Sequence, residues 1–371
     1  MGHQLMGAGP HRLSRADARR IMVRAQLLDV DRPTDLLDVV RHLTLLQLDP
    51  TAAVAPSADV VAWSRLGARY RPEHLRDALD EQRLIEVRQR ARPREDVSLY
   101  RAEMEAWPGD GLGTDLTAWQ IEAEAWVEAN DACRRDVIEA LRQDGPLPLR
   151  ELPDTCEVPW RSTGWTHHKN LRRMLDFLVA RGEVAAAGWS GRDKLWDLAT
   201  RIYPDDPVVP AAEAARERAV RLHAALGLTR PDRAHPVGEP AVVDGVPGRW
   251  SVDPAQLDAL ASPFVGRTAL LSPLDLLIRD RLRMETLFEF DYALEMYKPA
   301  SQRRWGYWAM PILVGDRLVG KLDARADRTE GALVINAVHE DAPFDRSTAA
   351  AVDAEISALA DWLGLERVSR R

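Results

Sequence analysis

Three consecutive residues, Gln47, Leu48 and Asp49, have the types and spacing that could prepare a water molecule for hydrolysis. The Asp49 carboxylate could accept a proton from a water and stabilise a nearby positive charge. The Gln47 amide has a donor end and an acceptor end, so it could orient the same water. On extended backbone both polar side chains would face one side while Leu48 anchors in the core. The alternative is that Asp49 only forms a turn that fixes Pro50.

Two expected helices precede this motif and would position it. The first covers 14–29 and begins with a capping box formed by Ser14 and Asp17. The second covers 34–46, with a buried face predicted to comprise Leu37, Val40, His42 and Leu45. Because Pro50 disfavours helical geometry at Asp49, the motif should lie where an apolar helix or short strand gives way to a loop.

Length and composition predict a globular protein with more than one domain. A chain of 371 residues has room for two or three domains of usual size. Hydrophobic residues make up 46% and charged residues 29%, which excludes a disordered or fibrous chain. No apolar stretch approaches the roughly 20 residues of a membrane span. The start of the chain lacks the pattern of a secretory signal, so we expect a cytoplasmic protein.

Net charge and cysteine content narrow the possible partners. A net charge of −8 means that any surface for nucleic acid must be local. The two cysteines, Cys133 and Cys156, could pair once at most, and neither Cys-x-x-Cys nor Cys/His ligand spacing is present. We therefore expect neither a structural zinc site nor a disulfide framework.

The order of elements between 131 and 205 predicts a winged helix. Helices are expected over 134–143, 149–152 and 166–181, followed by strands over 182–189 and 194–198 that are joined by a turn at 190–193. The buried face of the third helix is predicted to comprise Leu171, Met174, Leu175 and Leu178. In this variant of the helix-turn-helix, the third helix enters the major groove of DNA.

Basic side chains cluster at the two parts of a winged helix that contact DNA. The expected DNA-binding residues are His167, His168, Lys169, Arg172 and Arg173 at the start of the third helix, with Arg192 and Lys194 at the tip of the wing. The alternative is a solvated basic helix face. A metal site at the paired histidines is disfavoured, because consecutive helical residues point about 100° apart.

The flanking regions complete an α+β fold that is mostly helical. Region 1–130 is predicted to be helical apart from one small strand at 84–87 that arginines flank. Region 206–371 begins with a helix over 210–228 and a hairpin over 241–252, which should expose Arg249 and Trp250. Strands at 290–297, 307–314, 317–325 and 331–338 and a helix over 347–363 then predict an antiparallel sheet with helical ends.

Several blocks together resemble the winged-helix DNA glycosylases of the YcaQ/AlkZ type, in the right order and over nearly the whole chain. The blocks are Leu46–Asp49, the central winged helix, Leu271–Arg281, Phe290–Tyr292, Glu295–Ala300, Arg303–Tyr307 and Val319–Arg328. The resemblance implies a C-shaped assembly of tandem winged-helix motifs with a C-terminal β-rich element that grips double-stranded DNA. The implied regions are 1–130, 131–205 and, with a shortened third winged helix, 206–371.

The resemblance also implies a reaction: hydrolysis of the N-glycosidic bond of bulky N7-alkylated purines, and in some members the unhooking of interstrand crosslinks. Its catalytic motif is Gln-apolar-Gln or Gln-apolar-Asp, and Gln47–Asp49 matches the second form. Asp275, Arg279 and Tyr307 would line the active site, and Arg303 and Arg304 would contact DNA. No cofactor, no metal and no obligate protein partner is implied, so a monomer associated with the nucleoid is expected.

Two departures from the family pattern and two other functions stay open. The Tyr-Trp-Ala-His stretch of many relatives is replaced by Leu84–Arg90, which lacks the histidine. The chain after Leu226 also passes through Pro231 to Pro240 directly into the hairpin, so the third winged helix has less chain than in relatives. A winged-helix regulator without chemistry is the alternative function. A metal nuclease is disfavoured, since no carboxylate cluster surrounds Asp49.

Overall fold

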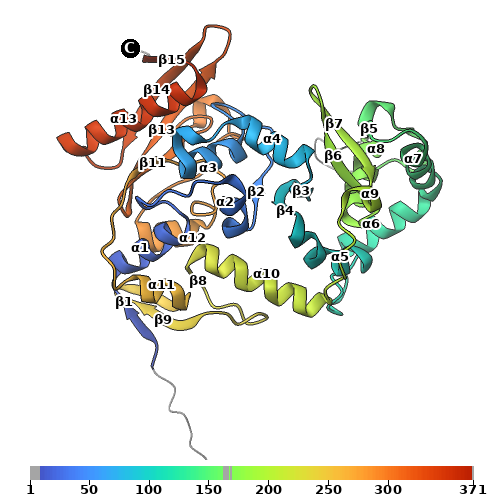
Figure 1. Cartoon of the computed structure of the whole chain (residues 1–371), viewed down its shortest axis with the longest axis horizontal. Coiled ribbons are helices and arrows are strands. Elements are labelled where there is room, and N and C mark those ends of the chain that lie inside the picture. The colour runs from blue at the N-terminus through green and yellow to red at the C-terminus, as the bar shows by residue number, and fades with distance from the viewer. Residues whose placement is uncertain (1–8, 162–166, 168, 370–371) are drawn as a thin grey trace, which may run out of the picture. The chain divides into compact units, whose positions relative to one another are not determined.

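The computed structural model describes residues 9–161, 167 and 169–369 (Figure 1). The chain forms two compact units: unit 1 comprises Met1–Pro72 and Ala219–Arg371, and unit 2 comprises Glu73–Arg218. The first boundary falls at the start of α4 (Pro72–Asp80), and the second falls within α10 (Ala211–Leu226). This division into two units does not test the three expected regions, 1–130, 131–205 and 206–371. They remain predictions, and so does the tandem winged-helix arrangement.

Unit 1 contains two sheets. The larger sheet has the order β11-β12-β13-β14-β15, formed by Thr268–Leu270, Met310–Val314, Arg317–Asp327, Ala332–Glu340 and Glu366–Ser369. The smaller sheet has the order β1-β9-β10-β8, formed by His11–Leu13, Glu239–Val243, Val246–Val252 and Leu228–Thr229. Strands β11 to β14 pair antiparallel, as expected, whereas β15 returns parallel to β14. The α+β class is therefore confirmed.

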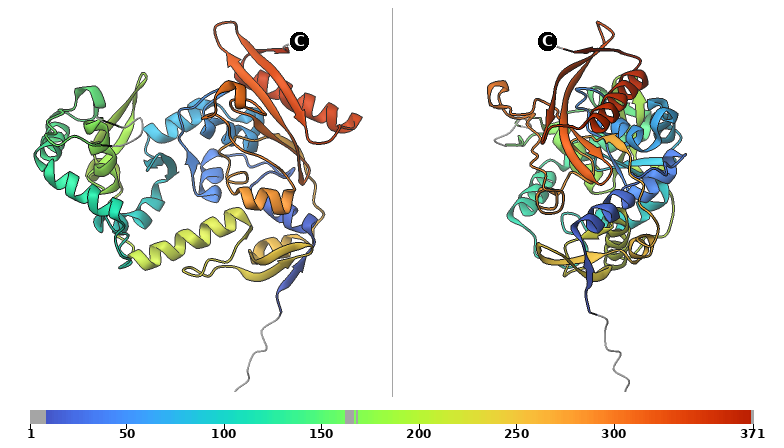
Figure 2. Two further views of the ribbon diagram at one scale, coloured as in Figure 1. Left: turned by 180° about the vertical axis from the view of Figure 1, so that it is seen from behind. Right: turned by 90° about the vertical axis from the view of Figure 1, so that its left-hand side faces the viewer.

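Helices surround these sheets. They are α1 (Arg15–Ala25), α2 (Leu36–Leu43), α3 (Ser57–Leu66), α11 (Pro254–Ala259), α12 (Arg281–Arg283) and α13 (Arg346–Leu363), with short 3-10 turns at Gly67–Arg69 and Ala300–Gln302 and a π-helical turn at Met284–Phe288. Helix α13 lies along one face of the larger sheet and contacts β11 and β12 (Figure 2). In the described part of the chain, no helix is long and apolar enough to cross a membrane.

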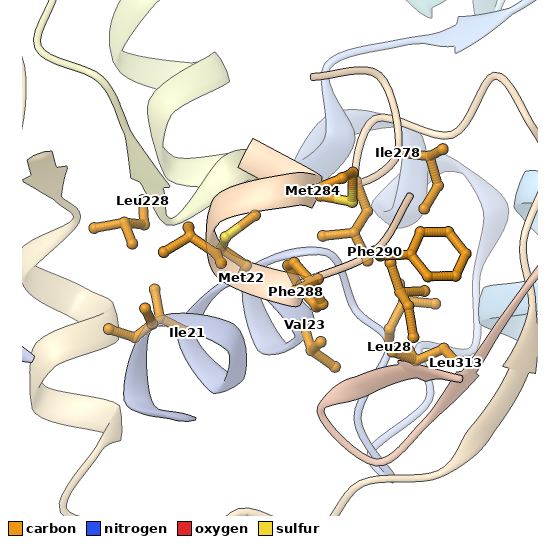
Figure 3. Close-up of a cluster of buried hydrophobic side chains, with 14 of the residues drawn as sticks. Ile21, Met22, Val23, Leu28, Leu228, Ile278, Met284, Phe288, Phe290 and Leu313 are labelled. Carbon is orange, nitrogen blue, oxygen red and sulfur yellow. The ribbon is translucent and has the colours of Figure 1, made fainter. Parts of the chain in front are cut away.

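The core of unit 1 joins segments that are far apart in the sequence (Figure 3). The Ser14 hydroxyl accepts the Asp17 amide at 3.0 Å, so the expected capping box starts α1. Behind this cap the apolar face of α1, with Ile21 and Met22, packs against Met284 and Phe288 of the π-helical turn. Burial of this face fixes α1 against the C-terminal half of the chain.

Unit 2 is built from helices and two small sets of strands. The helices are α4 (Pro72–Asp80), α5 (Ser98–Glu105), α6 (Ala118–Ala129), α7 (Asp131–Asp144), α8 (Asn170–Ala180) and α9 (Ala199–Ile202), with 3-10 turns at Arg94–Val97 and Leu149–Glu151. Strands β3 (Leu84–Val87) and β4 (Arg90–Pro93) form a hairpin, and β5 (Leu147–Pro148), β7 (Asp193–Leu198) and β6 (Val184–Ser190) form a sheet in that order.

The expected elements of the 131–205 region are present in unit 2. Ser190 pairs with Asp193, so the loop of the β6–β7 hairpin is Gly191-Arg192, as the turn residues predicted. The buried face of α8 also includes the four residues expected there, Leu171, Met174, Leu175 and Leu178. Helix α8 begins at Asn170 rather than Thr166, and 162–166 and His168 lie outside the described residues.

The helix expected over 34–46 is shorter than predicted, and its buried face differs. Helix α2 spans only Leu36–Leu43, because the Asp35 side chain caps its start and Thr44, at φ 68°, ends it. Its buried residues are Leu36, Val39, Val40 and Leu43, so only Val40 of the expected face is correct and His42 is exposed.

The strand expected at 290–297 does not form. Glu289, at φ 53°, turns the chain, and 291–297 is irregular. The carboxylate of Glu295 accepts hydrogen bonds from the backbone amides of Arg304 and Trp305, at 2.7 and 2.8 Å. These two amides therefore bond a side chain rather than a neighbouring strand. The following strand, expected from Tyr307, begins only at Met310.

Candidate active site and nucleic-acid surfaces

The Gln47–Asp49 motif directly follows α2. Strand β2 (Leu46–Gln47) leads into an irregular loop in which the Asp49 amide donates to the Gln47 carbonyl at 3.1 Å. Leu46, 1% exposed, is the residue that anchors this segment in the core, whereas Leu48 is half-buried. The expected anchor was therefore wrong by two positions: Leu46 is buried, whereas Gln47, Leu48 and Asp49 are all half-buried.

The Asp49 carboxylate is half-buried and only partly used. Its Oδ1 accepts the Thr51 amide at 2.8 Å, so the expected turn around Pro50 is present. Within residues 9–161, 167 and 169–369, Oδ2 accepts no hydrogen bond and the Gln47 side-chain amide makes none. One bond therefore fixes the direction of the carboxylate while its second oxygen and the Gln47 amide remain available to a ligand.

Strand β13 is contacted by the loop that follows the Gln47–Asp49 motif and by a second loop. The Ala326 amide donates to the Ala53 carbonyl at 2.8 Å, which ties the loop after Asp49 to β13. A second loop, 291–309, approaches the same strand at Asp323: a Cβ added to Gly306 would clash with the Asp323 carboxyl group. Residues 323 and 326 are about 10 Å apart along a strand. The two loops therefore contact β13 at positions three residues apart.

Loop 291–309 is held from within by a buried carboxylate. Glu295, 2% exposed, accepts the Arg304 and Trp305 amides and, at 2.8 Å, the Lys298 ammonium. Desolvation opposes the charge of Glu295, but these hydrogen bonds outweigh it and hold the pKa of Glu295 below its usual value. The Tyr292 hydroxyl donates to the Ala309 carbonyl at 2.8 Å. The loop is thus fixed at both ends and at its centre.

This fixed loop carries aromatic and cationic side chains outward. Tyr297 is 89% exposed. It lies in the family block Glu295–Ala300, but the sequence pattern did not mark it as a site residue. Tyr307 is 40% exposed, with the Arg303 guanidinium 5.0 Å from its ring centre. Arg304 is exposed and pairs with Asp291 at 2.9 Å. A solvent-exposed ring on a rigid loop with cations beside it is suited to stacking on a base.

Asp323, which lies beneath this loop, is a further candidate that was not singled out from the sequence. Burial raises the pKa of Asp323, while a hydrogen bond with Asn336 and the charges of His339 and Arg303 oppose that rise. A half-buried carboxylate with a raised pKa, next to an exposed cationic loop, is typical of functional positions.

Asp275 does not face a ligand. Its carboxylate forms a two-point ion pair with the Arg65 guanidinium, and both side chains are 0% exposed. Arg65 also donates to the Gln26 carbonyl at 3.1 Å. The pair joins α3, whose residues are all buried, to the segment that follows β11. Asp275 is thus part of a buried ion pair that holds the fold, and its expected place at the active site stays a prediction.

The other two residues expected at the active site, Arg279 and Tyr307, are exposed. In the described part of the chain, no hydrogen bond or ion pair connects either of them, or Asp275, to Gln47 or Asp49. Their role at the site thus remains a prediction.

The hairpin β9–β10 presents Arg249 but not Trp250. Trp250 is 1% exposed in the core, with the Arg230 guanidinium stacked 3.9 Å from its ring centre. The strand register shifts between Val246 and Trp250, where Gly248 has φ 92°, and this irregularity turns the Trp250 ring inward. The expected exposure of Trp250 is therefore wrong, while Arg249 lies on the surface.

In unit 2, several of the expected DNA-binding cations have partners within the protein. Arg172 and Arg173 lie 3.6 and 3.7 Å from Asp176 oxygens, and the Arg173 guanidinium lies 4.9 Å from the Trp160 ring centre. Burial raises the pKa of Asp176, and the charges of Arg172 and Arg173 partly offset that rise. Both arginines therefore also serve to compensate a buried carboxylate.

The β6–β7 hairpin of unit 2 contains one engaged and one exposed cation. Lys194 lies in the second residue pair from the turn, and its half-buried ammonium contacts both Glu86 oxygens at 2.7 Å. Arg192 occupies the tip and is exposed, while His167 and Lys169 lie exposed just before α8. Arg192, His167 and Lys169 are thus exposed at the expected surface.

Comparison with known proteins supplies the family. The family model "DNA glycosylase AlkZ-like" matches residues 40–362, which include the Gln47–Asp49 motif. The solved structure of Streptomyces sahachiroi DNA glycosylase AlkZ matches with a TM-score of 0.67 at 17% sequence identity, covering 97% of this chain and 99% of that chain. At this identity the structural likeness concerns the fold, whereas the family model spans most of the sequence. The resemblance of the sequence blocks is thereby confirmed: the chain belongs to the AlkZ-like DNA glycosylase family.

Proposed function

We propose that this protein hydrolyses the N-glycosidic bond of N7-alkylated purines in duplex DNA, with interstrand crosslinks through N7 as a further substrate. Alkylation at N7 makes the base cationic and therefore a good leaving group. Bond cleavage then needs little assistance to the base. It needs stabilisation of the positive charge that builds on the sugar, and a water held at the anomeric carbon.

The single observation that carries this proposal is the half-used Asp49 carboxylate. Its Oδ1 is held by the Thr51 amide and its Oδ2 is not bonded by the described residues. A carboxylate fixed in this way can stabilise the cationic sugar without first reorganising, and can accept the proton of the attacking water. The unengaged Gln47 amide would orient that water.

The DNA would contact the exposed groups of both units. In unit 1 these are Arg249, Arg304 and Tyr297, together with the half-buried Arg303; in unit 2 they are His167, Lys169 and Arg192. An enzyme that acts on a base within a duplex must unstack it, and an aromatic wedge can occupy the space left behind. We assign that wedge to Tyr297, because its ring is the most exposed aromatic side chain of the rigid loop 291–309. Arg172 and Arg173 would contribute less, since Asp176 already neutralises part of their charge.

An excision assay tests the proposal. Duplex DNA with a single N7-alkylguanine is incubated with the protein, in buffers with and without EDTA, and abasic sites are measured by alkaline strand cleavage. We expect Asp49→Asn to lower the single-turnover rate roughly 100- to 1000-fold, as for other lost charge-stabilising groups. Gln47→Ala should lower it less. Excision should be the same with EDTA, since a cationic leaving group needs no Lewis acid.

The matched control is Asp38→Asn, which also removes a carboxylate near the motif. Asp38 lies on α2, is largely exposed and pairs with Arg41 at 3.5 Å. This variant should excise like the unchanged protein. Equal activity of the Asp49→Asn and Asp38→Asn variants would exclude the catalytic role of Asp49. The monomeric state, the cytoplasmic location and the association with the nucleoid remain predictions.

A further inference from the structure

The two cysteines of the chain meet in unit 2, whereas Gln47 and Asp49 belong to unit 1. Cys133, at the start of α7, is buried, and Cys156 lies half-buried in the irregular segment 152–161 that precedes α8. Their sulfur atoms are 2.8 Å apart, and the Cys156 thiol donates to Cys133 Sγ. Both are free thiols.

Hydrogen bonds on both sides of Cys156 set this contact. The Thr155 hydroxyl donates to the Asp136 carboxylate of α7 at 2.7 Å. The Val158 amide donates to the Asn130 side chain at 3.0 Å, and the Trp126 indole donates to the Val158 carbonyl at 2.9 Å. Because the flanking residues are fixed to α7 and to the end of α6, the two sulfurs stay together without the help of a covalent bond.

The contact also makes one of the sulfurs reactive. The hydrogen bond from Cys156 lowers the pKa of Cys133 to about 7, and raises the pKa of Cys156, which holds the shared proton. The pair thus forms a thiolate more readily than an isolated cysteine does. A thiolate is the nucleophile in oxidation and in disulfide formation.

We propose that Cys133 and Cys156 form a reversible oxidation site that closes into a disulfide when the protein meets a peroxide. Within the pair, Cys156 passes the shared proton to Cys133, and the resulting Cys156 thiolate, the more accessible sulfur, attacks hydrogen peroxide. It takes one oxygen to give a sulfenic acid, and the second peroxide oxygen leaves as hydroxide, which solvent protonates to water. The Cys133 sulfur then attacks the sulfenic sulfur, forming the S–S bond and releasing a second water. In sum, two thiols and one peroxide give one disulfide and two waters, and a dithiol reductant reverses the step.

The disulfide would fasten the segment that leads to α8. It would link α7 to residue 156 across a sequence separation of 23 residues. A link across a loop of this length restricts the unfolded chain and thereby stabilises the folded unit. The oxidised protein should therefore unfold at a temperature higher by roughly 5–10 °C.

Together with Asp154, the two cysteines could instead form a metal site. Asp154 lies beside the cysteines, and the ligand atoms of the three residues are within 4.8 Å of one another. A structural zinc site takes four protein ligands, and the described residues supply three here. Two zinc-bound sulfurs must also stand farther apart than the 2.8 Å between these atoms. The geometry therefore favours a thiol pair, and zinc binding is an outcome that the test must separate.

The experiment uses the intact protein. The protein is reduced, freed of reductant and treated with hydrogen peroxide, and its mass, its free thiols and its melting temperature are measured. Because the chain has only two cysteines, any disulfide within one chain must join Cys133 to Cys156. Cys133→Ser and Cys156→Ser are the matched controls, since each keeps one thiol and cannot form the bond.

We expect a loss of two hydrogen atoms in mass, a loss of both free thiols and a higher melting temperature, all reversed by dithiothreitol and absent from both serine variants. The proposal is overturned if the thiols survive peroxide, or if each cysteine only gains two or three oxygen atoms without a crosslink. It is equally overturned if the purified protein retains one equivalent of zinc that protects both thiols. None of these outcomes depends on excision activity.

Discussion

Loop 46–53 and segment 272–283 of unit 1 each contain an aspartate from a family block, and the two carboxylates have different surroundings. Asp275 is enclosed by the Arg65 guanidinium, with both side chains 0% exposed. Asp49 shares one oxygen with the Thr51 amide and keeps the other unbonded by the described residues. A family block therefore marks two kinds of carboxylate, one that holds the fold and one that is available for chemistry, and only the partners distinguish them.

The cations show the same division. Near α8, the charges of Arg172, Arg173 and Lys194 are balanced by Asp176 and Glu86. In loop 291–309 the buried carboxylate of Glu295 holds two backbone amides as well as the Lys298 ammonium, and Arg304 pairs with Asp291 in an ion pair that is more than half exposed. The number of basic residues in a segment thus overstates its capacity to bind phosphate where acidic partners lie within reach.

The largest expected effect comes from breaking the buried pair. Asp275→Asn removes one charge and leaves the Arg65 guanidinium buried without compensation. Loss of one partner of a buried ion pair costs about 3–5 kcal/mol of unfolding free energy. Urea unfolding of the Asp275→Asn variant should show this loss, and the fraction that remains folded should still excise alkylated bases.

The matched control for that variant is Asp291→Asn. Asp291 also pairs with an arginine, Arg304, but both side chains are more than half exposed. Because water screens such a pair, its loss should cost at most about 1 kcal/mol. The distinction between the two aspartates fails if Asp275→Asn unfolds like the unchanged protein yet loses excision, since Asp275 would then act on substrate.

Local signals in the sequence predicted much of the fold. The Ser14–Asp17 capping box, the buried face of α8 and the Gly191-Arg192 turn each depend on residues within about four positions of one another. Strands β1 and β15 and the irregular segment after Glu289 were missed. The two strands pair with segments that no local pattern reveals: β1 pairs with β9, more than two hundred residues away, and β15 pairs with β14 across helix α13.

The candidate site was predictable to the same extent. The turn at Asp49 follows from the neighbouring proline, and the motif itself was recognised by family resemblance. The enclosure of Asp275 depends on Arg65, 210 residues away in the sequence, and the inward turn of Trp250 depends on an irregular register near Gly248. No periodicity carries such information, so these two assignments needed the three-dimensional structure.

The next test concerns Tyr297, the most exposed ring of loop 291–309. Tyr297→Ala removes a ring that is 89% exposed and contributes little to packing, so stability should be unchanged. If the ring stacks in the duplex, its loss should weaken binding to lesion-containing DNA by roughly 1–3 kcal/mol, as for other stacked aromatics. Tyr297→Phe keeps the ring and should bind normally in fluorescence anisotropy. Normal binding by Tyr297→Ala would remove loop 291–309 from the DNA surface.

The smallest effect separates exposed from engaged cations in unit 2. Arg192→Ala should reduce the slope of log affinity against log salt by about 0.9, the value for one phosphate contact on duplex DNA. Lys194→Ala should leave that slope nearly unchanged, because the Lys194 ammonium is bound to Glu86. It should instead lower stability, since it leaves the buried Glu86 carboxylate without its partner. Equal reductions of the slope in both variants would show that Lys194 exchanges Glu86 for phosphate on binding, and partners in the free protein would then no longer predict which cations contact DNA.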